Sequence, residues 1–364
     1  MRFLRKEICG EQKYLLLWKF RIPYQTEVWK EGRRLKIGPF SIPYRFYQKG
    51  SGIYLQIWRL RFRWGTVPLT RRKRHFKQRK RLNTECCIRL LKKELSEGLG
   101  YRPDIEAPKS FNEKILWLKF FYHDPLIRTC CDKYAVKEYV AKTVGGSYVL
   151  PVLAAWEDPA EIDFAGLPQQ FVLKVNWSSG YNIIVKDKAA LDAPAAIEQL
   201  AEWMRPESNS YFDTFNWGYR DMRPVIYAEP YIEQCDGQVY DYKFFINEGR
   251  FLFMFIATDR HGDHSLTYTF YDSEFRPLPF TYGGKPNASP IPQMPYNLEK
   301  MIEIAKKLAE PLPFVRVDFY EVNRTEFYVG EMTFYSGGGT LGFDPVSWDF
   351  ELGKRIKLPE VRKG

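Results

Sequence analysis

The chain has 364 residues, of which 45% are hydrophobic and 17% aromatic. This composition is far from the low-hydrophobicity, high-charge signature of a disordered chain, so we expect a globular protein of about two or three folded units. No stretch reaches the roughly 18–20 apolar residues that a membrane span requires, and the N-terminus lacks the apolar segment of a secretory signal. We therefore expect neither an integral membrane protein nor a secreted one, and a cytoplasmic location.

Charge is distributed unevenly along the chain. Residues 1–82 hold 23 Lys or Arg against 4 Asp or Glu, a net charge of +19, whereas residues 83–364 hold 32 against 40, a net charge of −8. The excess peaks in RRKRHFKQRKR (71–81). Such a run favours an anionic partner, which would be nucleic acid, an acidic lipid surface or an acidic polymer. The alternative is a solvated linker.

The six cysteines include no C-x-x-C pair, and His261 and His264 lack the helical spacing of a zinc site. We expect reduced, structural cysteines and no histidine metal site.

The first 70 residues predict short β-strands, because aromatic and branched residues alternate with Gly and Pro. The expected strands are KYLLLWKFRIPY, GRRLKIGPFSIPY and GIYLQIWRLRF, and IPY recurs at 22–24 and 42–44, which suggests a repeated β-hairpin unit. In IWRLRFRW (57–64) every second residue is basic, so a strand there would place Arg59, Arg61 and Arg63 on one face. The result would be a basic sheet face.

From Asn83 the pattern changes to mixed helices and strands, which indicates an α+β fold. Helices are expected at 84–97, after the capping box formed by Ser110 and Glu113, after Asp132, at 195–204 and at 297–310. Strands are expected around the loop in FVLKVNWSSGYNIIVKDK (171–188), and in VIYAEPYIEQ, VYDYKFFI, RFLFMFIATDR and a final hairpin at 314–335; residues 276–296 are expected to form a long loop.

The final hairpin brings two carboxylates together. If its turn is centred on Arg324 and Thr325, Asp318 faces Glu331 and Arg316 faces Thr333, and all four share one sheet face. Opposed carboxylates repel each other unless a cation lies between them, and oxygen ligands of this kind suit Mg²⁺ that bridges nucleotide phosphates. The alternative is an exposed strand face with ordinary surface acids.

Two weaker elements accompany the hairpin. Lys174 lies in an otherwise apolar strand, and the loop Ser178-Ser179-Gly180 that follows can present N–H groups to phosphate, although no Walker or Rossmann glycine motif occurs. Lys174 is equally compatible with a surface strand lysine. Asp241 and Lys243 would share a strand face, a pattern that solvated charges also produce.

The ordered series DKYAVKEY, FVLKVNWSSGYNIIV, AEPYIEQ with DYKFF, FVRVDFY and GEMTFYSGGG resembles the ATP-grasp enzymes, most closely their TupA-like branch, over roughly residues 105–350. The resemblance implies two α+β lobes that sandwich ATP and Mg²⁺, preceded by the small basic β-rich module. We expect the module at 1–82, a helical segment at 83–160, lobes at 161–226 and 227–353, and a tail at 354–364.

The resemblance also implies roles for individual residues. The catalytic residues would be Arg316, as the anion clamp, and Lys174. The metal ligands would be Asp318, Glu331 and, with less support because the family has Asn there, Thr333. The nucleotide would be held by two lysines, by the small loop, by the strand between the lobes and by the segment that contacts the ribose. The residues implied are Lys133, Lys174, Ser178, Ser179, Gly180, Glu229, Tyr231, Ile232, Asp241 and Lys243.

The implied activity is a ligation in which a uronic-acid carboxylate of a bacterial surface polysaccharide, activated as an acyl phosphate, is joined to an amino acid or another amine. The expected partners are an acidic or lipid-linked glycan acceptor and an amine donor, with peripheral contact of 1–82 at the inner face of the membrane; nucleic acid is not expected. Two alternatives remain: a glycosyl or phosphoryl transferase with the same fold, and a non-catalytic glycan- or membrane-binding protein. Arg260 and the 337–342 loop are candidate acceptor contacts by position alone.

Overall fold

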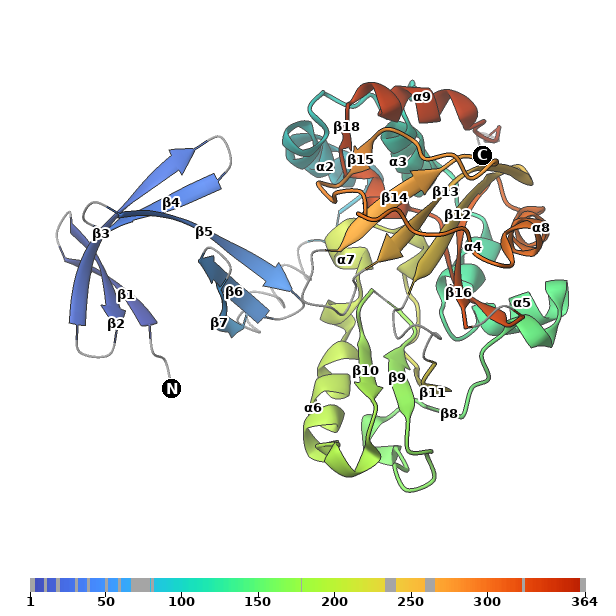
Figure 1. Cartoon of the computed structure of the whole chain (residues 1–364), viewed down its shortest axis with the longest axis horizontal. Helices are drawn as coiled ribbons and strands as arrows, with labels where there is room; N and C mark the ends of the chain where they lie inside the picture. The colour runs from blue at the N-terminus through green and yellow to red at the C-terminus, as the bar shows by residue number, and fades with distance from the viewer. Residues whose placement is uncertain are drawn as a thin grey trace. The chain divides into compact units, whose positions relative to one another are not determined.

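The structure is a computed structural model of the whole chain (Figure 1). It describes the backbone of strands between residues 4 and 66, and, with most side chains, Arg79 and residues 82–177, 179–232, 240–258, 266–322 and 325–360. The chain divides into two compact units, Met1–Gln78 and Arg79–Gly364. The finer division of the second unit into 83–160, 161–226, 227–353 and 354–364 stays a prediction.

The described part of the first unit is an antiparallel seven-stranded sheet in chain order. Each of the three expected strands is in fact a hairpin, because two-residue connections interrupt it. For example, Ile57 pairs with Leu60, so the strand expected over 57–64 is wrong. Equivalent strands recur every 20 residues, which places both IPY motifs alike in β3 and β5. The strands are β1 (Leu4–Cys9), β2 (Gln12–Leu17), β3 (Phe20–Trp29), β4 (Gly32–Ile37), β5 (Phe40–Lys49), β6 (Gly52–Ile57) and β7 (Leu60–Thr66).

The basic face expected from Arg59, Arg61 and Arg63 depends on side chains outside the described ones. It stays a prediction.

The second unit contains two antiparallel sheets with helices packed against them, as the α+β pattern predicts. The larger sheet has the order β14-β13-β12-β16-β17 and the smaller one β10-β9-β11-β8. The larger sheet's strands are β12 (Asp241–Asn247), β13 (Arg250–Thr258), β14 (Thr267–Tyr271), β16 (Phe314–Glu321) and β17 (Phe327–Thr333). The smaller sheet's are β8 (Ala154–Trp156), β9 (Phe171–Val175), β10 (Asn182–Val185) and β11 (Ile226–Pro230). Inside the expected long loop, β15 (Thr281–Tyr282) pairs with β18 (Phe343–Asp344).

The helices begin and end close to their expected bounds because their caps are local. Ser110 accepts the N–H of Glu113, whose carboxylate in turn accepts the N–H of Ser110, so the expected capping box is confirmed. The helices are α2 (Thr84–Leu99), α3 (Phe111–Phe121), α4 (Pro125–Cys131), α5 (Val136–Val144), α6 (Ala193–Trp203), α7 (Tyr211–Thr214), α8 (Leu298–Ala309) and α9 (Ser347–Arg355). Short 3-10 turns are η1 (Gly146–Tyr148), η2 (Pro159–Glu161), η3 (Lys188–Ala190), η4 (Pro206–Ser208), η5 (Trp217–Tyr219) and η6 (Ser336–Gly339).

Each sheet of the second unit has its own core. Phe244, Phe319 and Met301 of α8 belong to the core of the larger sheet. Leu173, Ile226 and Leu200 of α6 belong to the core of the smaller one. In Figure 1 the smaller sheet and α6 form one lobe, and the larger sheet with α3, α8 and α9 forms the other. The two lobes can therefore present side chains to each other from independently packed frameworks.

In the part of the chain that the structure describes, no helix is both long and apolar enough to cross a membrane. Four cysteines there, Cys86, Cys87, Cys130 and Cys131, are free thiols, as expected.

Candidate active site

The register of the β16–β17 hairpin confirms the expected pairs. Asp318 faces Glu331 and Arg316 faces Thr333. Nearer the turn the register shifts by one residue, so Phe319 faces Val329 and Gly330 is the extra residue of a β-bulge. A Cβ at Gly330 would overlap the ring of Tyr320. The bulge therefore needs a glycine.

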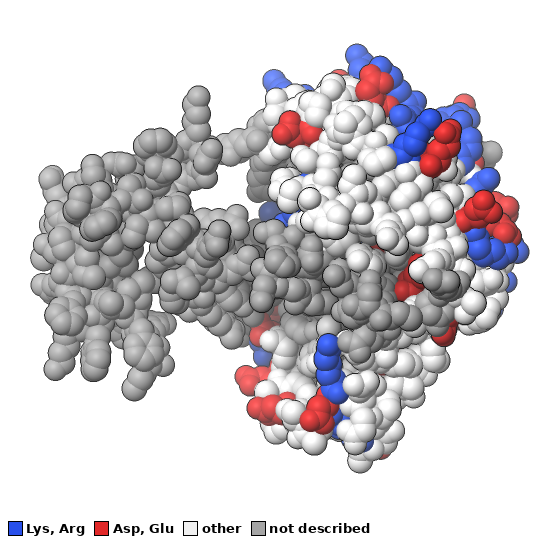
Figure 2. All heavy atoms as spheres, viewed as in Figure 1, with Lys and Arg blue, Asp and Glu red and all other residues white. Residues whose placement is uncertain are grey.

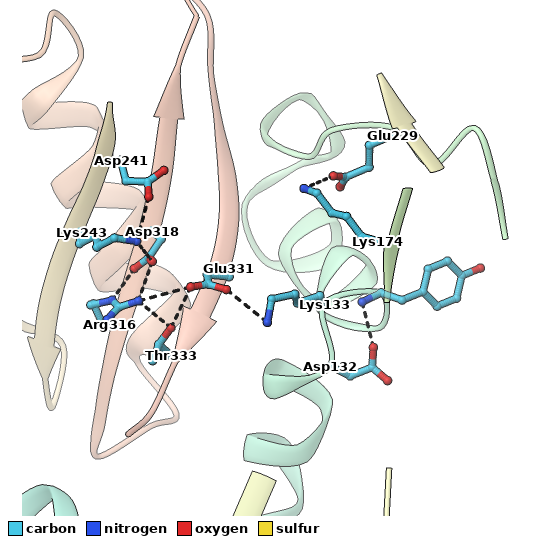
Figure 3. A network of polar contacts seen from close by, with 11 residues as sticks. Asp132, Lys133, Lys174, Glu229, Asp241, Lys243, Arg316, Asp318, Glu331 and Thr333 are labelled. Atoms are coloured by element: carbon cyan, nitrogen blue, oxygen red, sulfur yellow. Dashed lines mark hydrogen bonds and ion pairs between the residues drawn. The ribbon is translucent and has the colours of Figure 1, made fainter. Parts of the chain in front are cut away.

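Arg316 lies between the carboxylates that were expected to repel each other. Its Nε donates to Asp318 Oδ1 at 2.6 Å and its Nη2 to Asp318 Oδ2 at 2.7 Å, a bidentate pair. The same Nη2 is 3.3 Å from Glu331 Oε1 and 3.0 Å from Thr333 Oγ1 (Figure 3). The chain's own guanidinium thus supplies the cation that the opposed acids require.

A second cation comes from the neighbouring strand. Lys243 on β12 lies directly across from Asp318 and forms an ion pair with it, and its Nζ is 3.4 Å from Asp241 Oδ2. Asp241, Lys243 and Asp318 are all at least 95% buried. Lys243, Asp318 and Glu331 therefore form a row across three adjacent strands on one sheet face.

Lys133 reaches this row from the helical side. Its Nζ lies 3.3 Å from Glu331 Oε2, as Figure 3 shows. The same Nζ is 5.8 Å from the centre of the Tyr219 ring. Burial alone would raise the pKa of Glu331, but Lys133, Lys243 and Arg316 outweigh it and hold that pKa well below its usual range. Glu331 is therefore an anion that three cations face.

A buried asparagine fixes the position of Lys133. Asn176 donates from Nδ2 to Asp132 Oδ2 at 2.8 Å, and its carbonyl accepts the N–H of Lys133 at 3.1 Å. Asp132 was expected to cap a helix, but α5 begins only at Val136. The Asp132 carboxylate instead accepts the N–H groups of Tyr134 and Ala135, in the turn that precedes α5. Lys133 is thereby held at the start of that turn, facing Glu331.

A separate cluster surrounds Glu229 on β11. Lys174 from β9 and Lys137 from α5 both form ion pairs with its carboxylate. Burial would raise the pKa of Glu229, but the two lysines outweigh it and lower that pKa. Lys174 points away from the core of the small sheet, since Leu173 and Val175 beside it are buried. This places Lys174 beside Glu229, as Figure 3 shows.

The remaining predicted nucleotide contacts lie in loops. Ser179 and Gly180 are exposed, and Gly180 has a φ of +78° with open space around it. Tyr231 and Ile232 are half-buried at the end of β11. Ser178 and Arg260 lie outside the described residues. The roles of these residues stay predictions.

Sequence reasoning missed three side chains of the site. Lys137 had a signal, because it lies one helical turn after Lys133. Asn176 and Ser336 had none. Ser336 follows β17, and its hydroxyl accepts a hydrogen bond from Arg316 Nη1 at 3.1 Å, which ties the glycine-rich 337–342 segment to the site.

The donor set suits a metal that is shared with phosphate. Among the described residues no group of three or more His, Cys, Asp or Glu side chains is placed to hold a metal ion. Mg²⁺ is commonly bound by one or two carboxylates together with substrate phosphates, rather than by an all-protein cage. Asp318 and Glu331, two opposed carboxylates beside Lys133, Lys243 and Arg316, fit that pattern.

We compared the sequence and the fold with those of known proteins. The family model described as TupA-like ATPgrasp matches residues 113–357. No curated protein matches the chain.

Solved structures of ATP-grasp ligases match at low identity. The ADP complex of purK, an N5-carboxyaminoimidazole ribonucleotide synthetase, is 15% identical with a TM-score of 0.36, covering 57% of this chain and 45% of that one. D-alanine–D-alanine ligase from Bacillus anthracis, complexed with ATP, is 16% identical with a TM-score of 0.36, covering 62% and 67%. The ATP-grasp ligase PsnB is 11% identical with a TM-score of 0.35, covering 59% and 56%. The chain thus spans less than half the length of purK. Because the family model covers more than half of the chain and includes every site residue described above, the chain belongs to the TupA-like ATP-grasp family.

Proposed function

We propose that this protein is an ATP- and Mg²⁺-dependent carboxylate–amine ligase that amidates a uronic-acid carboxylate of a bacterial surface polysaccharide with an amino acid or another amine. ATP-grasp proteins bind ATP and are typically ligases of this class. The observation that carries the proposal is the position of Arg316, which is held by Asp318, Glu331 and Thr333, with Lys133 on the other oxygen of Glu331.

Bound MgATP would supply the phosphoryl group that turns a carboxylate into an acyl phosphate, open to attack by an amine. The chain's residues hold and orient the reactants. Lys133 and Lys174 would hold the phosphates, and Asp318 and Glu331 the metal. Arg316 is fixed by two bonds to Asp318 and one to Ser336, so it would act as an anion clamp from a pre-oriented position.

The acceptor and the amine are the finer part of the proposal. Lys133, Lys243 and Arg316 are paired with Glu331, Asp241 and Asp318, so the choice of a carboxylate acceptor rests on the family resemblance and not on spare positive charge. The uronic acid and the amino acid rest on the family resemblance.

The nucleotide site is tested by thermal melting of the full chain with MgATP. A ligand at 100 times its Kd stabilises by about 2.7 kcal/mol, which corresponds to a shift of roughly 4 °C at about 2.1 cal/mol/K of unfolding entropy per residue. We expect a Mg²⁺-dependent shift that shrinks in Glu331→Gln and persists in Glu274→Gln, whose side chain is 66% exposed and away from the site. No shift in the wild type would contradict ATP binding.

Product chemistry then tests the ligase itself. With an oligouronate and mixed amino acids, a ligase releases ADP and inorganic phosphate together, and the glycan gains the mass of an amide. Carboxyl-reduced oligouronate is the control and should release no phosphate. A phosphorylated or glycosylated product would assign the site to a transferase instead.

A further inference from the structure

A groove of about 960 Å³ lies on the second unit between the start of α3, the start of β13 and the end of α9. These elements lie together around the described C-terminal end (Figure 1), where Figure 2 shows Lys and Arg side chains interspersed with acidic ones. The groove is lined by twelve residues: Ala107, Pro108, Lys109, Lys114, Arg250, Phe251, Leu252, Lys354, Arg355, Ile356, Lys357 and Leu358.

The lining is strongly basic although the surrounding sequence is acidic. Six of the lining residues are Lys or Arg and none is Asp or Glu, whereas residues 83–364 as a whole carry a net charge of −8. Two acids near the groove are paired with lining lysines: Glu351 is 2.6 Å from Lys354 and Glu248 is 3.4 Å from Lys357. Glu106, beside Ala107, is exposed. A local excess of one sign in a concave surface concentrates ions of the opposite sign.

Three of the six cations are available for a ligand. Lys109, Arg250 and Arg355 are exposed, and none is ion-paired with an acid in the part of the chain that the structure describes. Glu113, the acid nearest in sequence to Lys109, is used up in the cap of α3, where Oε2 accepts the N–H groups of Lys109 and Ser110. These hydrogen bonds leave the negative charge of Glu113 in place, so the positive excess of the groove rests on its six cations outnumbering Glu113, Glu248 and Glu351.

The walls of the groove are held in place. Lys114 Nζ donates to the carbonyls of Gly353 at 2.9 Å and Ile356 at 2.5 Å, which ties α3 to the end of α9. Asn247 and Lys357 exchange two hydrogen bonds, at 2.8 and 2.9 Å, which ties the same segment to β12. A groove that is rigid before binding loses little conformational entropy when a ligand enters.

The groove is separate from the candidate active site. Arg250 pairs with Asn247 at the end of β12, whereas Asp241 and Lys243 lie at its other end. Asp241 and Asn247 are six positions apart on β12, about 20 Å at 3.3 Å per residue. Arg316 lies nearer the groove, because it faces Phe245, two positions from Asn247. No residue that lines the groove takes part in the site described above.

We propose that this groove binds a carboxylate-bearing saccharide chain, at a site distinct from the nucleotide site. Arg250 and Arg355 offer planar guanidinium groups suited to carboxylates. Half-buried Phe251, Leu252 and Leu358 lie between the cations and offer apolar surface to the C–H faces of sugar rings. The concave shape favours an elongated saccharide chain over a flat lipid surface. The choice of a uronate-type ligand rests on the proposed function, whereas the preference for an anion rests on the groove alone.

The test needs a local readout, because the net charge of +19 in residues 1–82 would dominate total binding of any polyanion. The probe is trigalacturonate in which one carboxylate is activated as a succinimidyl ester and the others stay charged. The reference probe is a trisaccharide whose single carboxyl group carries the same ester, so that it has no charge. A lysine Nζ attacks the ester, an amide forms and N-hydroxysuccinimide leaves. Mass spectrometry of the full chain then gives, for each lysine, the ratio of charged-probe to neutral-probe labelling, without ATP or amine.

We expect this ratio at Lys109 and Lys354 to exceed that at Lys306 and Lys307 of α8, which lie among Glu299, Glu303 and Glu310. Arg250→Gln with Arg355→Gln removes two charged contacts but no labelled lysine and should reduce the ratio at Lys109 by roughly tenfold or more. The matched control, Lys306→Gln with Lys307→Gln, should leave it unchanged. Arg355→Gln alone provides a milder variant if the double variant folds poorly.

Equal ratios at the groove and at α8, or an unchanged ratio in the arginine variant, would overturn the proposal. Unlabelled competitors identify the ligand class: oligouronate should displace the probe, and neutral dextran should not. Stronger displacement by oligo-dT or by phosphatidylglycerol vesicles at equal charge would overturn the saccharide assignment. Since no nucleotide is present, a negative result here leaves the ligase test unaffected, and a failed ligase test leaves this one unaffected.

Discussion

Asp318 shares its carboxylate between two buried cations, Arg316 and Lys243. Replacing Asp318 by Asn keeps the shape of the side chain but leaves both cations without their main counter-charge. Breaking a buried ion pair in this way costs about 3–5 kcal/mol. We expect Asp318→Asn to lower the free energy of unfolding, measured by urea denaturation, by that amount.

The control is Glu274→Gln, which removes an ion pair between exposed side chains, Glu274 and Arg276. Solvent screens that pair, so the urea midpoint should not move. Equal midpoints for Asp318→Asn and the wild type would show that the charges around Asp318 are not coupled as described.

Lys119 is a buried lysine of α3 that the proposed chemistry does not use. Its ammonium contacts only carbonyl groups, those of Thr214 at 3.2 Å and of Gly338. Burial lowers the pKa of Lys119 to about 7. Between pH 7 and the ordinary lysine pKa the unfolded chain therefore binds more protons than the folded one, so the cost of burying this ammonium falls and the free energy of unfolding rises as the pH rises.

We expect the wild type to gain stability relative to Lys119→Met between pH 7 and pH 9, by up to about 1.4 kcal/mol per pH unit. Urea unfolding of both proteins at pH 7, 8 and 9 measures the difference. A difference that is independent of pH, or one that shrinks as the pH rises, would contradict the buried, weakly basic ammonium.

At the scale of residues, the sequence predicted what one hairpin determines and missed what distant segments bring together. Counting back from a turn at Arg324 and Thr325 predicts that Asp318 faces Glu331, as observed, but Phe319 faces Val329, so the pairing also depends on a β-bulge that the counting did not include. Asn176 positions Lys133 through a contact with Asp132, which lies 44 residues away. No local pattern marks such a contact.

At the scale of elements, the β-bulge at Gly330 sets the register that places Glu331 opposite Asp318. A methyl group at Gly330 would meet the ring of Tyr320. We expect Gly330→Ala to destabilise the protein by about 1–3 kcal/mol, the usual cost of overpacking, and to weaken MgATP binding. Combining it with Tyr320→Ala should cost less than the sum of the two single variants.

Gly146→Ala is the matched control, because a Cβ there has nothing within 4 Å. It should leave the urea midpoint nearly unchanged. Strict additivity of Gly330→Ala and Tyr320→Ala would mean that the ring is not what excludes a side chain from the bulge.

The first unit shows why element boundaries are harder to predict than element types. Its residues have strand propensity throughout, and a two-residue connection such as the one between Ile57 and Leu60 leaves the alternating pattern unbroken. The helices of the second unit were located more closely, since Ser110 and Glu113 mark a start with a specific hydrogen-bond pair. Residue propensity identifies strand-forming segments, but only the pairing of strands shows where the chain turns back in a hairpin.

At the scale of the whole molecule, opposite charges are separated between the two ends of the chain. The net charge is +19 over residues 1–82 and −8 over residues 83–364. We propose that the basic end contacts an anionic membrane surface. A lysine or arginine near such a surface contributes about 1 kcal/mol, so several together hold a protein that has no membrane-spanning helix among its described residues.

We expect the full chain to sediment with phosphatidylglycerol vesicles at low salt, not with neutral phosphatidylcholine vesicles, and to be released as salt screens the attraction. Replacing Arg71, Arg72, Lys73 and Arg74 by Gln should weaken binding by on the order of 10³-fold, at about 1 kcal/mol per residue. Replacing Lys142, Lys300, Lys306 and Lys307, an equal loss of charge from the acidic part of the chain, should have little effect. Each variant loses four positive charges. Equal weakening by both sets would mean that net charge, rather than its position in the sequence, determines binding.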